Sequence, residues 1–116
     1  MNVRCTLKKN SDFRRLYAKG KSAANRYLVL YCRRNGCAVN RLGYTVSAKL
    51  GGAVVRNRVR RRLREVYRLA SPAMKTGWDI VVVARSRCVG ARYSELERAF
   101  SDLCARLGLT QAEERG

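Results

Sequence analysis

The chain has 116 residues, 47% of them hydrophobic, which is enough for one domain with its own core. Its 26 Lys and Arg residues against 8 Asp and Glu give a formal net charge of +18. A charge this basic for the size indicates a polyanionic partner, either a nucleic acid or an anionic membrane surface. No apolar run approaches the ~20 residues of a transmembrane helix, and no secretory signal opens the chain, so we expect a soluble cytoplasmic protein.

The positive charge is concentrated in the first two-thirds of the chain. Between Phe13 and Arg64 there are fifteen Lys or Arg residues and no acid, whereas the stretch from Tyr93 onward has five acids and three bases. Twenty of the 26 bases are arginine, whose planar guanidinium forms bidentate hydrogen bonds with phosphate. The composition therefore favours specific phosphate contacts over a diffuse polycationic surface.

The first predicted element is a short helix over residues 10–20. It begins with two residues that can cap a helix and an acid in the first turn, and it ends at Gly20. Phe13, Leu16 and Tyr17 follow one another at i, i+3 and i+4, so two aromatic rings share one face of this helix.

A strand is predicted over residues 26–33, which are rich in β-forming residues. Side chains alternate across a strand, so one face is apolar and the other mixes aromatic rings with charge. The first face holds Leu28, Leu30 and Cys32, and the second holds Tyr27, Val29, Tyr31 and Arg33. Residues 42–47 are predicted as the antiparallel partner of this strand, connected to it by the turn-rich segment 35–40.

An amphipathic helix rich in arginine is predicted after the glycine loop at residues 49–52. Apolar residues recur at i, i+4, i+8, i+11 and i+15, namely Val55, Val59, Leu63, Val66 and Ala70. At about 100° per residue, the opposite face carries Asn57, Arg60, Arg61, Arg64 and Arg68. We expect one face to pack and the other to present an array of guanidinium groups, with the helix ending before Ser71.

Two further elements complete the order helix, strands, helix, strand, helix. The apolar run 79–84 predicts a strand covered on both faces, and residues 94–107 predict a helix with a capping box formed by Ser94 and Glu97. The apolar stripe of that helix is Leu96, Ala99, Phe100, Leu103 and Leu107. The order predicts an α+β sandwich with one layer of helices and one of strands.

No residues suited to catalysis or to metal binding gather in the sequence. Histidine is absent, and the five cysteines lack a C-x-x-C pair, so we expect neither a zinc site nor a catalytic residue. The acids before the C-terminal tail have simpler explanations: Asp12 as a helix N-terminal acid, Glu65 as a solvated neighbour of arginines and Asp79 as a strand-edge charge. A nuclease that acts alone is therefore disfavoured.

Four aromatic residues can contribute to nucleic-acid binding. Exposed rings beside a basic surface stack on unpaired bases, and the candidates here are Phe13, Tyr17, Tyr27 and Tyr31. Any one of them can instead be a core aromatic. Because two share a helix face and two share a strand face, a groove lined by aromatic rings is favoured.

The sequence resembles the protein subunit of bacterial ribonuclease P. The Arg-Asn-Arg triplet that opens a basic helix is typical of this family, and the matching run here is Leu50, Ala53, Arg56, Asn57, Arg58, Val59, Arg60, Arg61, Leu63 and Arg64. Three flanking blocks also match in order and spacing: residues 7–17, residues 24–31 and residues 43–47. Two departures are Ala48, where the family often has a second lysine beside Lys49, and Tyr17, where phenylalanine is common.

The resemblance implies a single RNA-binding domain over residues 1–116 with an αβββαβα sandwich of the ribosomal protein S5 domain 2-like kind. It also implies a left-handed βαβ crossover through the arginine helix, against the usual handedness. The family resemblance further implies that the protein assists a catalytic RNA that uses Mg²⁺, supplies no catalytic residue or cofactor site itself, and helps to remove the 5′ leader of precursor tRNA by endonucleolytic hydrolysis.

The resemblance assigns two sets of binding residues. The basic helix would face the catalytic RNA and the substrate through Arg56, Asn57, Arg58, Arg60, Arg61, Arg64 and Arg68. A cleft for the single-stranded leader would be lined by Phe13, Tyr17, Val29, Tyr31, Arg33 and Lys49. The expected partners are the ribonuclease P RNA and precursor tRNA, with no membrane and no obligate protein partner. The alternatives from composition alone are a small ribosomal protein and a polybasic membrane-surface module.

Overall fold

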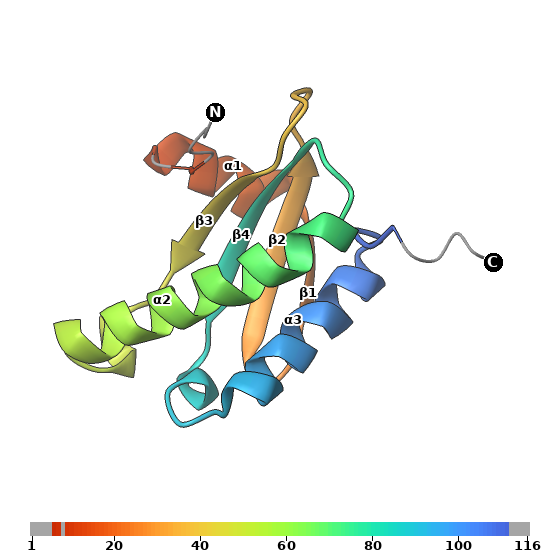
Figure 1. Cartoon of the computed structure of the whole chain (residues 1–116). Coiled ribbons are helices and arrows are strands. Elements are labelled where there is room, and N and C mark those ends of the chain that lie inside the picture. The colour runs from red at the N-terminus through yellow and green to blue at the C-terminus, as the bar shows by residue number, and fades with distance from the viewer. Residues whose placement is uncertain (1–5, 8, 112–116) are drawn as a thin grey trace.

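The computed structural model describes residues 6–7 and 9–111, which form a four-stranded sheet between helices (Figure 1). The elements in chain order are α1 (Asn10–Lys19), β1 (Lys21–Ala24), β2 (Leu28–Arg34), β3 (Arg41–Thr45), α2 (Ala53–Ala70), β4 (Trp78–Ala84) and α3 (Tyr93–Arg106). Three short 3-10 turns, Ala48–Leu50, Ser71–Ala73 and Ser86–Cys88, connect them. None of the helices in this part of the chain has the length and apolar character needed to span a bilayer.

The strand order in the sheet is β1-β2-β4-β3, so the predicted pairing of residues 26–33 with 42–47 is wrong. β4 inserts between those two strands, antiparallel to β2 and parallel to β3. The physical reason lies in the composition of β4, because a strand that is apolar on both faces is most stable in the middle of a sheet. The short strand β1, which sequence periodicity did not predict, pairs with β2 at one edge.

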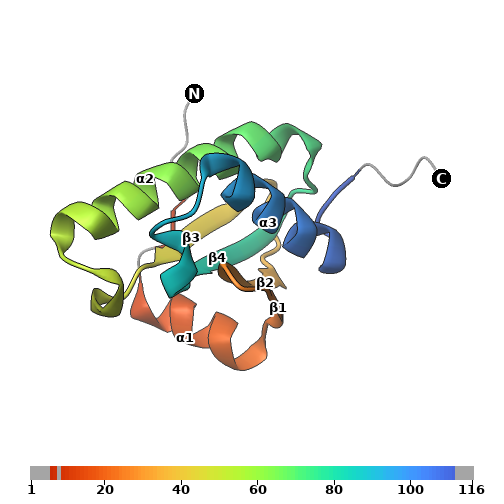
Figure 2. The ribbon, with the colours of Figure 1, turned by 90° about the horizontal axis from the view of Figure 1, so that it is seen from below.

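Helices cover both faces of the sheet, so the expected single helical layer is also wrong. α1 lies against one face, and α2 and α3 lie side by side on the other (Figures 1 and 2). The crossover from β3 through α2 to β4 is left-handed: in Figure 1 both strands run downward, α2 passes in front of the sheet, and β4 lies to the right of β3. This is the αβββαβα order with the crossover that the family resemblance implied.

The main core lies between the sheet and the pair α2 and α3. Leu28, Leu30 and Cys32 of β2 are fully buried there, as strand alternation predicted. The apolar stripe predicted for α3, residues 96, 99, 100, 103 and 107, is buried against them. A smaller second core on the other side of the sheet consists of Leu7, Leu16 and Val81, with Phe13, Tyr31 and Val83 packed on it.

The helix ends differ in detail from the predictions. α1 follows Lys9, and no side chain caps it. α3 starts one residue earlier than expected, and its first turn is closed by Glu95, whose carboxylate accepts a hydrogen bond from the Arg92 backbone N–H at 2.8 Å. The capping box predicted from Ser94 and Glu97 is therefore wrong by two positions. α2 ends at Ala70, before Ser71, as predicted.

Candidate nucleic-acid interface

The arginine helix α2 has the two faces that its periodicity predicted. Val59, Leu63 and Val66 are buried against the sheet and α3, while Val55 and Ala70 at the two ends of the stripe are partly buried. On the outer side the exposed residues of the predicted RNA-binding set are Asn57, Arg58, Arg61, Arg64 and Arg68, with Arg56 and Arg60 partly buried. The packing stripe thus fixes the helix, and the guanidinium groups line its outward side.

Two of the arginines on α2 have structural contacts that sequence periodicity does not distinguish from binding roles. Arg56 donates from Nε to the Gly51 carbonyl at 3.1 Å and so holds the glycine loop at the start of the helix. Arg62 donates to the Ala91 carbonyl at 2.7 Å and ties α2 to the loop before α3. By contrast, Arg58 and Arg61 make no hydrogen bond or ion pair with any described residue and are available to a partner.

Arg68 differs from the other exposed arginines of α2 because it is already paired with a carboxylate. Its guanidinium donates two hydrogen bonds to the Glu65 carboxylate, at 3.0 and 2.6 Å, and these bonds lower the pKa of Glu65. Glu65 is thus a neighbour of arginines, as predicted, and it compensates one of their charges. Within the predicted RNA-binding set, Arg68 therefore has a carboxylate partner, whereas Arg58, Arg61 and Arg64 form no ion pair with a described residue.

A groove runs between α1 and the edge strand β3. Its lining consists of Asn10, Phe13, Arg14, Tyr17, Tyr44 and Thr45. Tyr17 is 41% exposed, its hydroxyl lies 2.8 Å from Thr45 Oγ1, and its ring meets that of Tyr31 edge-on with 4.9 Å between centroids. The Phe13 ring lies 6.5 Å from the Tyr17 ring. The aromatic rings of α1 and β2 thus form one connected cluster that is open to solvent at Tyr17.

Gly43 of β3 allows Phe13 to reach this position. A Cβ atom at residue 43 would lie 2.6 Å from Phe13 Cζ, closer than real Cβ contacts, and 3.2 Å from Leu7 Cβ, which is a tight contact. The absence of a side chain therefore lets α1 dock closely on the sheet and fixes the floor of the groove.

The other residues predicted for the leader cleft are spread along the sheet. Val29, Tyr31 and Arg33 face α1, in register with Val83, Val81 and Asp79 of β4. Only Tyr31 contacts the ring cluster directly, whereas Arg33 lies at the end of the sheet where β3 begins. Lys49 is exposed in the 3-10 turn that follows β3, near the opposite end. The six predicted residues thus extend over the length of one sheet face rather than surrounding one pocket.

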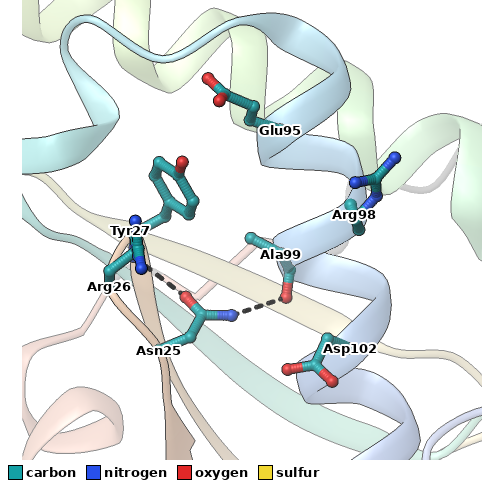
Figure 3. Close-up of a pocket in the computed structure, with 7 residues that line it drawn as sticks. All are labelled: Asn25, Arg26, Tyr27, Glu95, Arg98, Ala99 and Asp102. Carbon is teal, nitrogen blue, oxygen red and sulfur yellow. Dashed lines mark hydrogen bonds between the residues drawn. The ribbon is translucent and has the colours of Figure 1, made fainter.

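Tyr27 does not belong to this aromatic cluster, so its inclusion among the stacking candidates is corrected. It precedes β2, packs with the main core, and lines a pocket against α3 together with Asn25, Arg26, Glu95, Arg98, Ala99 and Asp102 (Figure 3). The Asn25 side chain accepts from the Tyr27 and Leu28 backbone N–H groups and donates to the Ala99 carbonyl. That corner of the chain joins β2 to α3.

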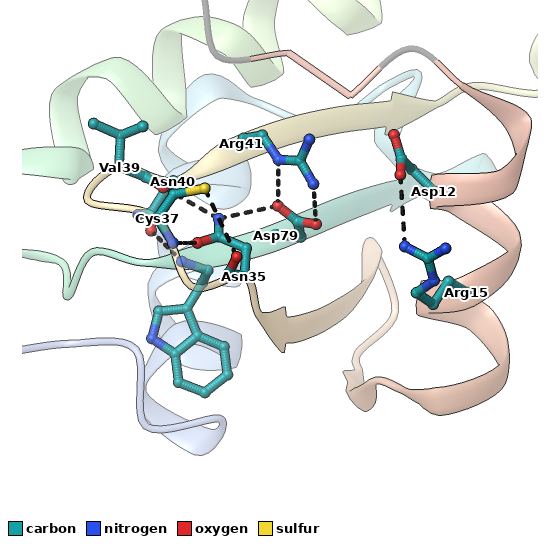
Figure 4. Close-up of polar contacts among 9 residues, drawn as sticks. Asp12, Arg15, Asn35, Cys37, Val39, Asn40, Arg41 and Asp79 are labelled. Atoms are coloured by element: carbon teal, nitrogen blue, oxygen red, sulfur yellow. Dashed lines mark hydrogen bonds and ion pairs between the residues drawn. The ribbon is translucent and has the colours of Figure 1, made fainter.

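Asp79 is a partner in an ion pair and not a strand-edge charge. Although it lies in the central strand, its carboxylate accepts two hydrogen bonds from Arg41, at 2.8 and 2.7 Å, and one from Asn35 at 3.0 Å (Figure 4). Asp12 lies in the first turn of α1 as predicted, 4.0 Å from Arg15. Within the described residues no group of three or more His, Cys, Asp or Glu side chains can hold a metal ion.

Sequence reasoning did not identify Tyr44 as a candidate binding residue. Tyr44 is a lining residue of the groove, but its ring packs with the main core on the α2 side of β3, where the Arg64 guanidinium lies 5.9 Å from the ring centroid. Burial raises the pKa of its hydroxyl far above the usual range, so the ring stays neutral beside Arg64. Tyr44 lies in the edge strand β3, and an exposed edge could have indicated a binding role. Because the predicted strand order was wrong, the sequence did not identify β3 as an edge strand.

The fold and this surface define a class of small, strongly basic α+β proteins with a guanidinium-rich helix beside an aromatic groove. The family described as ribonuclease P matches residues 1–108. The protein components of ribonuclease P from Alkaliphilus oremlandii and Clostridium acetobutylicum are 48% and 46% identical to the chain, over 89% and 94% of its length and 90% and 93% of theirs.

Solved structures agree with the sequence matches. The RNase P protein of Staphylococcus aureus superposes with a TM-score of 0.84 at 34% identity, covering 91% of this chain and 97% of that one. The RNase P protein of Thermotoga maritima gives 0.80 at 31% identity, over 87% and 96% of the two chains. The chain belongs to the ribonuclease P protein component family. It is thereby part of an endoribonuclease complex of tRNA 5′ processing and an associate of the ribonuclease P RNA.

Proposed function

We propose that this protein binds the catalytic RNA through the outer face of α2 and holds the single-stranded 5′ leader of precursor tRNA in the groove between α1 and β3. In this arrangement it assists the removal of the leader in the bacterial cytoplasm without contributing a catalytic group. The hydrolysis leaves a 5′ phosphate on the mature tRNA.

The observation that carries the proposal is the closeness of the two surfaces at the edge strand β3. Residues 44 and 45 of β3 line the groove with Phe13 and Tyr17, while the Tyr44 ring packs on the other face of the strand, where the Arg64 guanidinium of α2 lies 5.9 Å from its centroid. A strand in the groove can therefore place its bases on aromatic rings while its phosphates approach the guanidinium groups of α2. Recognition of unpaired nucleotides by stacking is the usual mode of binding single-stranded RNA.

The charge of α2 supports the same division of roles. Arg58 and Arg61 are exposed and have no acidic partner among the described residues, so like charges repel along the helix in the free protein. Crowded RNA phosphates remove that repulsion and release their own counterions. Hence α2 favours binding where phosphates are densest.

The chemistry of bond cleavage belongs to the RNA in this proposal. The carboxylates near the basic surface, Asp12, Asp79 and Glu65, are each held in an ion pair with an arginine. The proposal assigns Mg²⁺ to the RNA subunit, as the family resemblance implies, where a bound ion would activate the attacking water. The protein contributes affinity for the substrate and positive charge near the scissile phosphate.

One assay tests the proposal against its alternatives. Precursor tRNA is incubated with ribonuclease P RNA at low Mg²⁺, with and without the full-length protein, and the release of leader is followed. We expect cleavage to be stimulated, and no cleavage by the protein alone. A ribosomal or membrane-surface protein would give no stimulation, and a self-sufficient nuclease would cleave without the RNA.

A further inference from the structure

A second basic and aromatic site lies at the end of the sheet remote from the start of α2. Trp78, the only tryptophan of the chain, is the first residue of β4 and is half-buried. The Lys21 ammonium lies 5.4 Å from its ring centroid, and the Arg34 guanidinium carbon lies 5.6 Å from it. Three strands therefore contribute to this site, since Lys21 belongs to β1 and Arg34 to β2.

This site is separate from the groove. Trp78 lies on the same sheet face as the buried Ile80 and Val82, which face α2 and α3, whereas Phe13 packs on the opposite face. It is also distant from the triplet at residues 56–58. The triplet lies near the N-terminus of α2, the C-terminus of α2 is the end nearer Trp78, and the helix of 18 residues is about 27 Å long. Figure 1 shows β4 starting at the top of the sheet and α2 starting at the lower left.

The two cations lack an acidic partner. Neither Lys21 nor Arg34 forms an ion pair with any described residue, and the nearest carboxylate along the chain, Asp79, projects to the other face and is paired with Arg41. Lys21 makes one long hydrogen bond, 3.4 Å, to the Leu107 carbonyl. Two like charges thus converge on one aromatic ring without neutralisation, which is unfavourable until an anion binds between them.

We propose that Trp78, Lys21 and Arg34 bind an unpaired nucleotide of single-stranded RNA, with the base on the indole and its phosphate between the two cations. Tryptophan offers a large stacking surface, and both cations are on long side chains that are exposed to solvent. An incoming base can replace one cation on the ring while the phosphate keeps both of them nearby. The inference takes the nature of the partner, RNA, from the proposed function, but it involves none of the groove residues.

The single tryptophan provides a local readout. The full-length protein is titrated with a short oligouridylate while the fluorescence of Trp78 is followed. We expect saturable quenching. We also expect Lys21→Ala with Arg34→Ala to lower the log-log salt slope of oligonucleotide binding by about 0.7, the value for the one single-strand phosphate that is no longer neutralised. The double variant Arg87→Ala with Arg98→Ala removes the same charge from exposed positions elsewhere and serves as the control.

Further arms distinguish the possible outcomes. Quenching that persists in Tyr17→Ala would show that the site acts independently of the groove, so failure of the leader proposal would not be confused with failure of this one. Precursor tRNA with a long leader, precursor tRNA with a short leader and free ribonuclease P RNA are compared as competitors to identify the source of the nucleotide. Absence of quenching, or an equal loss of slope in the two double variants, would overturn the proposal. Trp78→Leu, with a labelled oligonucleotide, removes the ring while retaining an apolar side chain; we expect weaker binding, and unchanged binding would overturn the proposal.

Discussion

The guanidinium carbon of Arg64 lies 5.9 Å from the centre of the Tyr44 ring, joining the basic helix α2 to the edge strand β3. The contact links residues from two surfaces that the sequence analysis treated separately. Tyr44 is also a lining residue of the groove, although its ring packs on the α2 side of β3, so the groove and the Arg64 guanidinium lie on the two sides of one edge strand. This relationship makes Tyr44 the most informative residue to change.

Tyr44→Leu is expected to weaken the binding of precursor tRNA by about 1 to 3 kcal/mol, the range for the loss of one base–aromatic stack. The substitution retains apolar volume in a half-buried position and removes only the ring. Tyr44→Phe keeps the ring and should bind nearly as the parent protein does. The measurement is the Kd of the reconstituted holoenzyme for precursor and mature tRNA. Equal affinities of the Leu and Phe variants would argue against a stacking role.

Replacing both Phe13 and Tyr17 with Ala is expected to weaken precursor tRNA binding far more than mature tRNA binding, because only the precursor has a leader. Tyr17→Phe is the matched control: it loses the 2.8 Å hydrogen bond to Thr45 but keeps the ring. Its binding should stay unchanged, and because that hydrogen bond is exposed, stability should fall by at most about 1 kcal/mol. If the double variant weakens both tRNAs equally, the groove does not hold the leader.

The exposed arginines of α2 are expected to contribute unequally to the salt dependence of RNA binding. Replacing Arg60, Arg61 and Arg64 together should lower the log-log slope by about 0.7 to 0.9 for each phosphate that the helix no longer neutralises. Arg68→Ala should change the slope less than Arg61→Ala, because Glu65 already compensates the charge of Arg68. Titrations of ribonuclease P RNA over a range of salt concentrations measure both effects. An unchanged slope in the triple variant would remove the electrostatic role of this face.

Gly43→Ala is expected to destabilise the protein by about 1 to 3 kcal/mol, the usual cost of overpacking. The new methyl group would lie 2.6 Å from Phe13 Cζ, so the Phe13 ring must move from its place against β3. Gly90→Ala is the control, because a Cβ there meets nothing within 4 Å. Urea denaturation compares the two variants, and precursor tRNA binding should fall for the first alone. Equal stabilities would show that α1 is not held by this close approach.

Stability is expected to fall as the pH rises above about 9, the pKa of a cysteine in the unfolded chain. Burial raises the pKa of Cys88 to about 11 and that of Cys104 to about 12. Above pH 9 the unfolded chain releases these protons while the folded protein keeps them. The contribution of the two thiols to the free energy of unfolding is therefore complete below pH 9 and is lost between about pH 9 and 12. Thermal unfolding at a series of pH values checks this. Cys104→Ala should show a smaller loss between neutral and alkaline pH than the parent, and an identical loss would contradict the prediction.

Local patterns alone were enough to predict several elements. The 3.6-residue periodicity of α2 and α3 identified their buried stripes, and strand alternation placed Leu28, Leu30 and Cys32 in the core. These patterns are readable because burial of one helix or strand face repeats at a fixed interval along the chain. The arginine-rich outer face of α2 followed in the same way, as did the family resemblance, since both depend on residues close together in sequence.

Only the tertiary structure decided which strands are neighbours and which side chains remain free. The insertion of β4 between β2 and β3 depends on contacts between residues far apart in sequence, and it moves Tyr44 to an exposed sheet edge beside Arg64. The pairing of Arg68 with Glu65 distinguishes it from Arg61, although both lie on one helix face. The sequence by itself determined the faces of the individual elements, whereas long-range packing determined the groove, because each wall of the groove comes from a different element.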